Sequence, residues 1–198
     1  MMRRIAITSV ALLVLALPAL VTAATWEFDP AHTGTHFKVR HLMVSNVRGD
    51  FDKVSGRIVY DDKDISRSSA EITIDAASIN TRVAQRDAHL KSPDFLDVAK
   101  YPTIVFRSKK VDKAGDGKLR MTGDLTIRGV TRGVVLDIEG PTPPIKDMQG
   151  NTRVGGTATT TINRKDFGLT WNKALEAGGV VVGDEVEISI DIEIVKGA

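Results

Sequence analysis

Apolar and polar residues alternate along most of this chain, and the pattern is clearest near the C-terminus. From Glu185 to Ile194, valine and isoleucine occupy every second position, and charged or polar residues stand between them. A repeat of two matches a β-strand with one buried and one hydrated face. The pattern recurs, more or less completely, at residues 37–39, 51–60, 70–76, 104–106, 119–127, 134–138 and 154–162. The alternation therefore predicts an all-β fold.

Turn residues separate these segments at hairpin spacing. Gly115-Asp116-Gly117 is a strong hairpin signal, because this turn chemistry tolerates positive φ. Arg128-Gly129 marks a second short connection, and residues 141–150 form a longer loop. About eight antiparallel strands result, by the spacing of these signals.

Eight strands favour an up-and-down barrel, because closing the sheet removes its exposed edges. The interior of such a barrel holds side chains or one elongated ligand. A β-sandwich is the alternative architecture. Glycines suited to strand bends favour the barrel, and they stand at Gly49, Gly56, Gly155 and Gly156.

The block from Asn80 to Pro102 interrupts the alternation and follows a repeat of about 3.6 residues. This repeat predicts one or two short helices. The block concentrates charged and aromatic side chains, namely Arg82, Arg86, Asp87, His89, Asp94 and Phe95. We expect this helical insert to cap one side of the barrel, held in place by Asp87 and His89. Asp87 is expected to make a salt bridge or a helix-end contact with Arg82, Arg86 or a strand rim.

The first 23 residues are expected to be a cleaved signal peptide. Arg3 and Arg4 precede an apolar run, and Val21-Thr22-Ala23 offers the small and apolar residues of a cleavage site. A retained membrane anchor is the alternative, but the run is short for a span. We therefore expect residues 24–198 to be one exported domain in the periplasm, with no membrane span after cleavage.

Charge and cysteine content exclude several classes of function. The chain has 27 basic and 25 acidic residues, and the two arginines of the signal segment account for the difference. The exported domain would carry no net basicity to drive binding to nucleic acid or anionic membranes. Cysteine is absent. Disulfides, thiolate nucleophiles and cysteine-ligated metals are thereby excluded.

Candidate catalytic and metal-binding residues form no convincing set. His32 and His36 would share a strand face, but no nearby carboxylate or cysteine completes a metal site, so we expect ordinary hydrogen-bonded histidines and no metal. Asp87, His89 and Ser92 could be drawn as a hydrolytic triad. Triad members normally come from separate elements, so no catalytic residue is expected.

Small residues on the inward faces predict a cavity. By alternation, we expect Ala70, Ala76, Gly156 and Ala158 at inward positions. Small inward residues leave volume that suits an apolar ligand. The alternative is that inward aromatic side chains fill the core completely.

The chain resembles the YceI family in a series of motifs that runs through the exported domain in order. They are F-K-V-R-H-L (37–42), S-x-V-x-G-x-F (45–51), A-S-I-N-T (77–81), R-D-x-H-L-K-S-P-D-F-L-D-V (86–98), Y-P-x-I-x-F (101–106), G-D-L-T-I-R-G-V-T (123–131), I-N-R-K-D-F-G-L (162–169) and V-G-D-E-V from residue 182. Each motif alone is weak, but together they are specific.

This resemblance implies a lipocalin-like barrel with an elongated apolar cavity. It also implies an exported binding or transport protein rather than an enzyme, with a homodimer as the expected assembly. The implied ligand is a polyisoprenoid, an isoprenoid quinone or another long amphiphilic lipid, and no cofactor besides such a lipid is expected.

On this basis the strand faces predict the cavity lining. The expected lining residues are Phe37, Val39, Phe51, Ile72, Ile74, Phe106, Met121, Phe167 and Trp171, with Leu90 and Phe95 near the cap. A polar ligand head group is expected at the mouth, beside Arg82, Arg86 and His89. Two alternatives remain, a quinone-presenting accessory to a membrane cytochrome and a hydrolase that uses Asp87 and His89.

Overall fold

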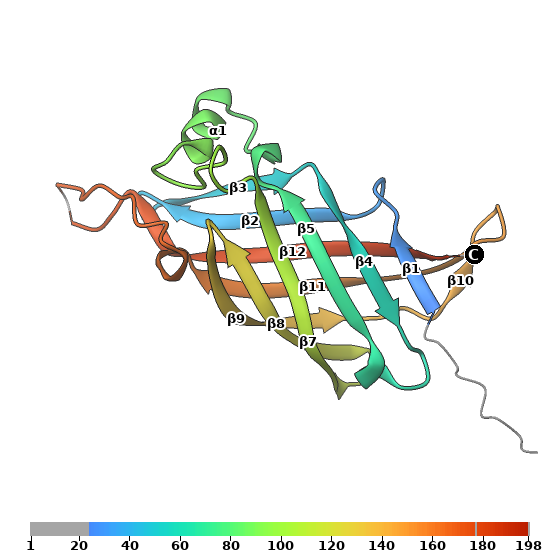
Figure 1. The fold of residues 1–198 in the computed structure, drawn as a ribbon. Helices are drawn as coiled ribbons and strands as arrows, with labels where there is room; N and C mark the ends of the chain where they lie inside the picture. Colours follow the sequence, from blue (N-terminus) through green and yellow to red (C-terminus); the bar gives the residue numbers. More distant parts are fainter. Residues whose placement is uncertain (1–23, 177, 198) are drawn as a thin grey trace, which may run out of the picture.

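The computed structural model describes residues 24–176 and 178–197. The predicted signal segment, residues 1–23, lies outside the described residues. In the described ranges, no helix has the length and apolar character needed to cross a membrane. The chain from residue 24 onward forms a single antiparallel sheet (Figure 1).

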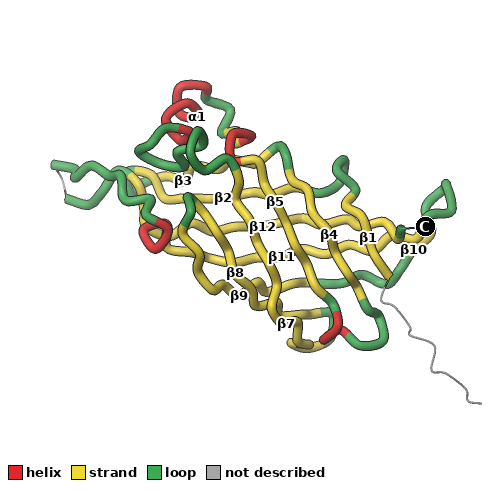
Figure 2. Tube along the Cα trace, in the orientation of Figure 1, coloured by secondary structure: helices red, strands yellow, loops and turns green. Residues whose placement is uncertain are grey.

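Strands make up most of the described chain, and the helical segments lie at their ends (Figure 2). The strands are β1 (Ala24–Phe28), β2 (Gly34–His41), β3 (Ser45–Phe51), β4 (Val54–Tyr60), β5 (Ser69–Asp75), β6 (Ile79–Asn80), β7 (Thr103–Gly115), β8 (Lys118–Ile127), β9 (Val130–Glu139), β10 (Ile145–Lys146), β11 (Thr152–Asn163) and β12 (Val182–Lys196). The helical segments are the α-helix α1 (Ala84–Lys91) and the 3₁₀ turns η1 (Ile65–Arg67), η2 (Ala76–Ser78) and η3 (Arg164–Phe167).

These strands make up a barrel of eight, because three of the eight barrel strands are each divided into two segments. β1 and β2 run in the same direction along β12, with Trp26 opposite Lys196 and Thr35 opposite Ile190. β3 and β4 form the next strand, since they pair with β2 and β1 respectively. β5 and β6 form the third in the same way. The short strand β10 pairs only at the margin of β11.

The barrel closes through its last strand. The strands follow one another around the sheet in chain order, and β12 pairs with β11 on one edge and with β1 and β2 on the other. Every strand of the main barrel therefore pairs with a neighbour along each of its two edges. The predicted eight-stranded antiparallel barrel is confirmed.

Two glycines predicted at strand bends allow neighbouring strands to approach closely. A Cβ atom on Gly56 would lie 2.3 Å from the carbonyl oxygen of Glu71 on β5. A Cβ atom on Gly49 would lie 2.5 Å from Cζ of Phe37. Because atoms cannot approach so closely, a larger residue at position 56 would force β4 away from β5, and one at position 49 would displace the Phe37 ring.

The alternating pattern places one row of each strand inside the barrel. On β12, Ile188, Ile190 and Ile192 pack against the core, while Glu185 and Glu187 are exposed. Burying an aliphatic side chain of this size contributes about 1.5–3 kcal/mol. Repeated around the barrel, this burial holds the fold together in a chain that has no cysteine.

The helical insert lies over one end of the barrel, as Figure 1 shows for α1. One α-helix forms, and the chain then returns through turns over residues 92–102. Asp97 in these turns has a φ of 49°. Phe95 and Leu96 from the same turns are buried and belong to the barrel core. The predicted cap is therefore present, and it is built as much from turns as from helix.

An ion cluster around Arg153 ties the first and last strands together at the opposite end. The Arg153 guanidinium donates to Asp147 at 2.7 Å, to Glu193 at 2.5 Å and to Asp29. These hydrogen bonds lower the pKa of Asp147 to about 2 and hold the pKa of Asp29 well below its ordinary value. Arg153 thereby connects β11 with β12, with the turn after β1 and with the loop before β11.

We predict that Arg153→Met lowers the melting temperature most at neutral pH. A depressed carboxyl pKa contributes stability above the unfolded-state value of about 3.9. That contribution is lost as the pH falls through the folded-state pKa, about 2 for Asp147. The variant would leave three carboxylates facing one another, and protonation would relieve their repulsion. Thermal melts should therefore show a difference from the wild type that is greatest above about pH 5 and shrinks toward pH 2.

Arg120→Met is the matched control, because it removes one exposed ion pair with Asp137. It should change the melting temperature little at any pH. A deficit in Arg153→Met that grew as the pH fell would contradict the assigned role of the cluster.

Candidate ligand-binding cavity

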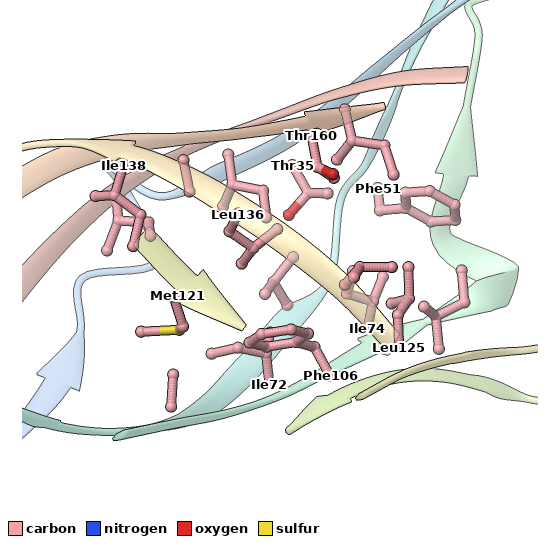
Figure 3. Close-up of a pocket in the computed structure, with 18 of the residues that line it drawn as sticks. Thr35, Phe51, Ile72, Ile74, Phe106, Met121, Leu125, Leu136, Ile138 and Thr160 are labelled. Carbon is pink, nitrogen blue, oxygen red and sulfur yellow. The ribbon is translucent and has the colours of Figure 1, made fainter. Parts of the chain in front are cut away.

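A cavity of about 280 Å³ runs along the inside of the barrel. Side chains from all eight barrel strands line it, together with residues of the cap. Aliphatic and aromatic side chains make up nearly the whole wall, and Figure 3 shows several of them converging from different strands. An interior of this kind suits an apolar ligand, because it offers few hydrogen-bonding groups.

The structure places most of the predicted lining residues on this wall. They are Phe37, Val39, Phe51, Ile72, Ile74, Leu90, Phe95, Phe106 and Met121. These positions agree with the predicted faces of β2, β3, β5, β7 and β8. That these side chains contact a ligand stays a prediction.

Phe167 and Trp171 do not line the cavity, and this part of the predicted lining is wrong. Phe167 is 2% exposed and packs within the core from η3. The Trp171 ring packs edge-on against His89 at 4.8 Å and, tilted by 46°, against Phe95 at 5.2 Å. A repeat of two does not describe this segment, because η3 and Gly168, with a φ of 75°, turn the chain out of the strand.

The cavity is closed at the capped end. Phe95, Leu96, Leu169 and Arg164 line it there, and all four are buried. At the other end the lining residues Phe28, Tyr60, Leu119 and Pro141 are only partly buried. This end lies remote from α1, and β1, β10 and the C-terminal end lie there (Figure 1).

The residues predicted to meet a ligand head group lie on the cap and not on the cavity wall. Arg82 is 87% exposed and lies 4.0 Å from Asp50. Arg86 donates to the hydroxyl of Thr81 at 2.7 Å and to its carbonyl oxygen at 2.9 Å. A head group inside the barrel would therefore not reach either guanidinium. The charged residues of the insert suggested the mouth of the barrel, but they lie on the outside of its closed end.

His89 and Asp87 also serve the cap. The His89 ring contacts Asp94 at 3.0 Å and packs edge-on against Phe95 at 5.0 Å. Asp87 accepts hydrogen bonds from the backbone N–H of Thr81 at 2.8 Å and from its hydroxyl at 2.5 Å. The expected holding role of Asp87 is confirmed, with Thr81 as its partner instead of Arg82 or Arg86.

The same contacts separate the residues of the drawn hydrolytic triad. Asp87 bonds Thr81, whereas His89 bonds Asp94, so no hydrogen bond joins Asp87 to His89 in the described part of the chain. A triad needs its acid to orient the histidine. The arrangement gives the hydrolase alternative no geometric support.

One group of described residues has the spacing of metal ligands, namely Asp29, His32 and Glu193. Arg153 donates to both carboxylates of this group. A guanidinium already compensates their charge, so the donor set is poorly suited to a cation. His32 lies in the turn after β1 and contacts Asp29, while His36 lies on β2 and contacts Asp50 at 2.7 Å.

Arg164 was not predicted as a site residue, yet it lines the closed end of the cavity. Its side chain is 3% exposed. The guanidinium donates to the carbonyl oxygens of Gly183 at 2.8 Å, Trp171 at 3.0 Å and Leu169. Burial lowers the pKa of Arg164. The sequence did offer one indication of this position. Arg164 follows the inward residue Ile162 by two positions, so the alternation would place it on the same inward face.

Comparisons with known proteins agree with this fold. The profile of the YceI-like domain matches residues 26–194. A UPF0312 protein of Staphylococcus aureus strain MSSA476 is 39% identical over 168 residues, which cover 85% of this chain and 95% of that protein.

Solved structures are similar over most of their length. The YceI protein of Campylobacter jejuni has a TM-score of 0.69 and 33% identity, covering 80% of this chain and 90% of that one. A polyisoprenoid binding domain from Saccharophagus degradans has a TM-score of 0.63 and 16% identity, covering 88% and 99% respectively. At that identity the second likeness shows the fold alone.

We predict that Arg164→Met destabilises the protein by about 3 kcal/mol, because it leaves several buried carbonyl oxygens without donors. Urea denaturation would measure this change. Lys165→Met is the control, since Lys165 is 45% exposed and contacts Asp184. Its effect should stay below about 1 kcal/mol. Equal effects of the two substitutions would contradict a structural role for Arg164.

Proposed function

This chain belongs to the YceI-like family, and from that premise we propose that it binds a long apolar or amphiphilic lipid inside the barrel. The observation that carries the proposal is the cavity of about 280 Å³, whose wall is almost entirely aliphatic and aromatic. Apolar surface placed in such a cavity is removed from water, which favours binding without any covalent step or metal.

Polyisoprenoids are the first ligands to test. The Saccharophagus degradans structure that shares this fold is described as a polyisoprenoid binding domain. An isoprenoid chain is long, apolar and narrow, which suits an interior enclosed by eight strands.

Binding energetics favour a chain over a small molecule. Each buried methylene contributes about 0.8 kcal/mol, so about ten would supply roughly 8 kcal/mol before the costs of association. Micromolar affinity corresponds to about that value in total, so a longer chain is needed to offset those costs. A chain longer than the cavity would extend through the partly exposed end, past Phe28 and Tyr60.

The role we propose is carriage or sequestration rather than catalysis. Export to the periplasm, cleavage after residue 23 and a homodimer complete the proposal. The mass of the exported polypeptide would test the cleavage site, and the mass of the protein in solution would test the homodimer. No contact within the described ranges favours the quinone–cytochrome alternative, which stays a prediction.

We predict that the wild-type protein binds a polyprenol and that Ala158→Leu weakens this binding at least tenfold. Ala158 is 1% exposed and lies on the cavity wall, so three added carbons would enter the space a chain must use. Displacement of a fluorescent fatty probe would measure affinity, and a thermal melt would confirm that the variant is folded.

Thr159→Leu is the matched control, because the next residue on β11 is exposed and should leave affinity unchanged. Native mass spectrometry of protein from the bacterial periplasm would identify lipids that copurify. Absence of both copurifying lipid and polyprenol uptake would overturn the proposed function.

A further inference from the structure

Thr35 of β2 carries a buried hydroxyl group inside the barrel. The residue is 4% exposed and lines the cavity. Its Oγ1 atom is buried and has no hydrogen-bond partner within the described ranges. Figure 3 shows Thr35 among the apolar side chains of the cavity, with Thr160 near it in the view.

The strand register explains why Oγ1 lacks a partner. Thr35 lies opposite Phe51 on β3 and Ile190 on β12. From Ile190 the same row of the sheet continues through Ala158, Ile138 and Leu119. All of these residues line the cavity, and none offers a polar side chain. A hydrogen bond to Oγ1 therefore has to come from a molecule inside the cavity.

Threonines elsewhere on the barrel are different. The Thr157 hydroxyl donates to Asp191 at 2.9 Å, and the Thr33 hydroxyl donates to the carbonyl oxygen of Glu193 at 3.1 Å. Valine has the shape of threonine and would fill the position of Thr35 without a polar atom. A buried hydroxyl without a partner costs free energy, so its presence points to a partner supplied by the ligand.

The charge of the wall limits what that partner can be. His36, Tyr60 and Arg164 are the titratable side chains of the lining, and of these only His36 and Arg164 can carry a positive charge. The His36 ring contacts Asp50 at 2.7 Å and is 45% exposed, and Arg164 donates to backbone carbonyls at the closed end. No free cation faces Thr35 from the lining residues. An ionised phosphate or carboxylate would therefore be buried there without a counter-charge, at a large desolvation cost.

We propose that the lipid carries a neutral hydroxyl or carbonyl oxygen that hydrogen-bonds Thr35 within the barrel. The polar end of the ligand then sits inside the apolar cavity, and the charged outer surface of the cap takes no part. Thr160 also carries a hydroxyl on the cavity wall; it follows Ala158 by two residues on β11 and gives the same region another polar atom. This inference rests on the proposed function.

Three probes with one twenty-carbon skeleton test the proposal: geranylgeraniol, geranylgeranyl diphosphate and the corresponding hydrocarbon. Their affinities would be measured with wild-type protein, Thr35→Val, Thr35→Ser and the control Thr157→Val. We expect wild-type protein to bind the alcohol more tightly than the hydrocarbon or the diphosphate. Thr35→Val should weaken binding of the alcohol about three- to tenfold, the range for one neutral hydrogen bond. Hydrocarbon binding should stay the same.

Thr35→Ser keeps the hydroxyl and should restore the preference for the alcohol, while Thr157→Val should behave as wild type. Without ligand, Thr35→Val should melt at or above the wild-type temperature, because it loses an unpaired hydroxyl. Unchanged alcohol binding in Thr35→Val, an equal loss for alcohol and hydrocarbon, or tightest binding of the diphosphate would each overturn the inference alone. Failure of wild-type protein to bind any probe would overturn the proposed function as well.

Discussion

Pairing of the last strand with the first is the interaction on which the rest of the structure depends. β12 pairs with β11 from Asn163↔Glu185 to Arg153↔Val195, and its other edge takes β2 and then β1. Without this closure the sheet would have two exposed edges and its inward rows would face water. The cavity exists because closure turns those rows toward one another. Since the chain has no disulfide, backbone ladders, apolar burial and the Arg153 cluster have to maintain it.

Most of the barrel could be predicted from the sequence, because alternation states directly which face of a strand is buried. The rows through Phe37 and Val39, through Ile72 and Ile74, and along β12 all took the predicted face. The interruptions were not predicted, since a strand that resumes in phase after a short turn has the same pattern as two hairpin strands. Only the register reveals that β1 and β2 share one edge of β12.

The positions of site residues were less predictable for two physical reasons. Phe167 and Trp171 follow the end of β11, where η3 breaks the repeat of two, so extrapolating the strand face failed there. The charged insert suggested a ligand mouth because charges are expected at an opening. In the structure those charges bond one another, Thr81 or Asp50, and the apolar residues of the insert close the barrel beneath them. Sequence composition does not distinguish a charged side chain that is available to bind a ligand from one that is already paired within the protein.

Polar atoms on the cavity wall indicate a contact with the ligand more reliably than exposed charges do. Arg164 is a full charge in the interior, yet its donors are matched by carbonyl oxygens, so it stabilises the closed end and offers nothing to a ligand. Thr35 is a single neutral hydroxyl, yet no group in the described part of the chain matches it. Inside an apolar barrel the cost of an unmatched polar atom is high. The small polar group without a partner is therefore more informative about the ligand than the buried cation or the charged residues on the cap.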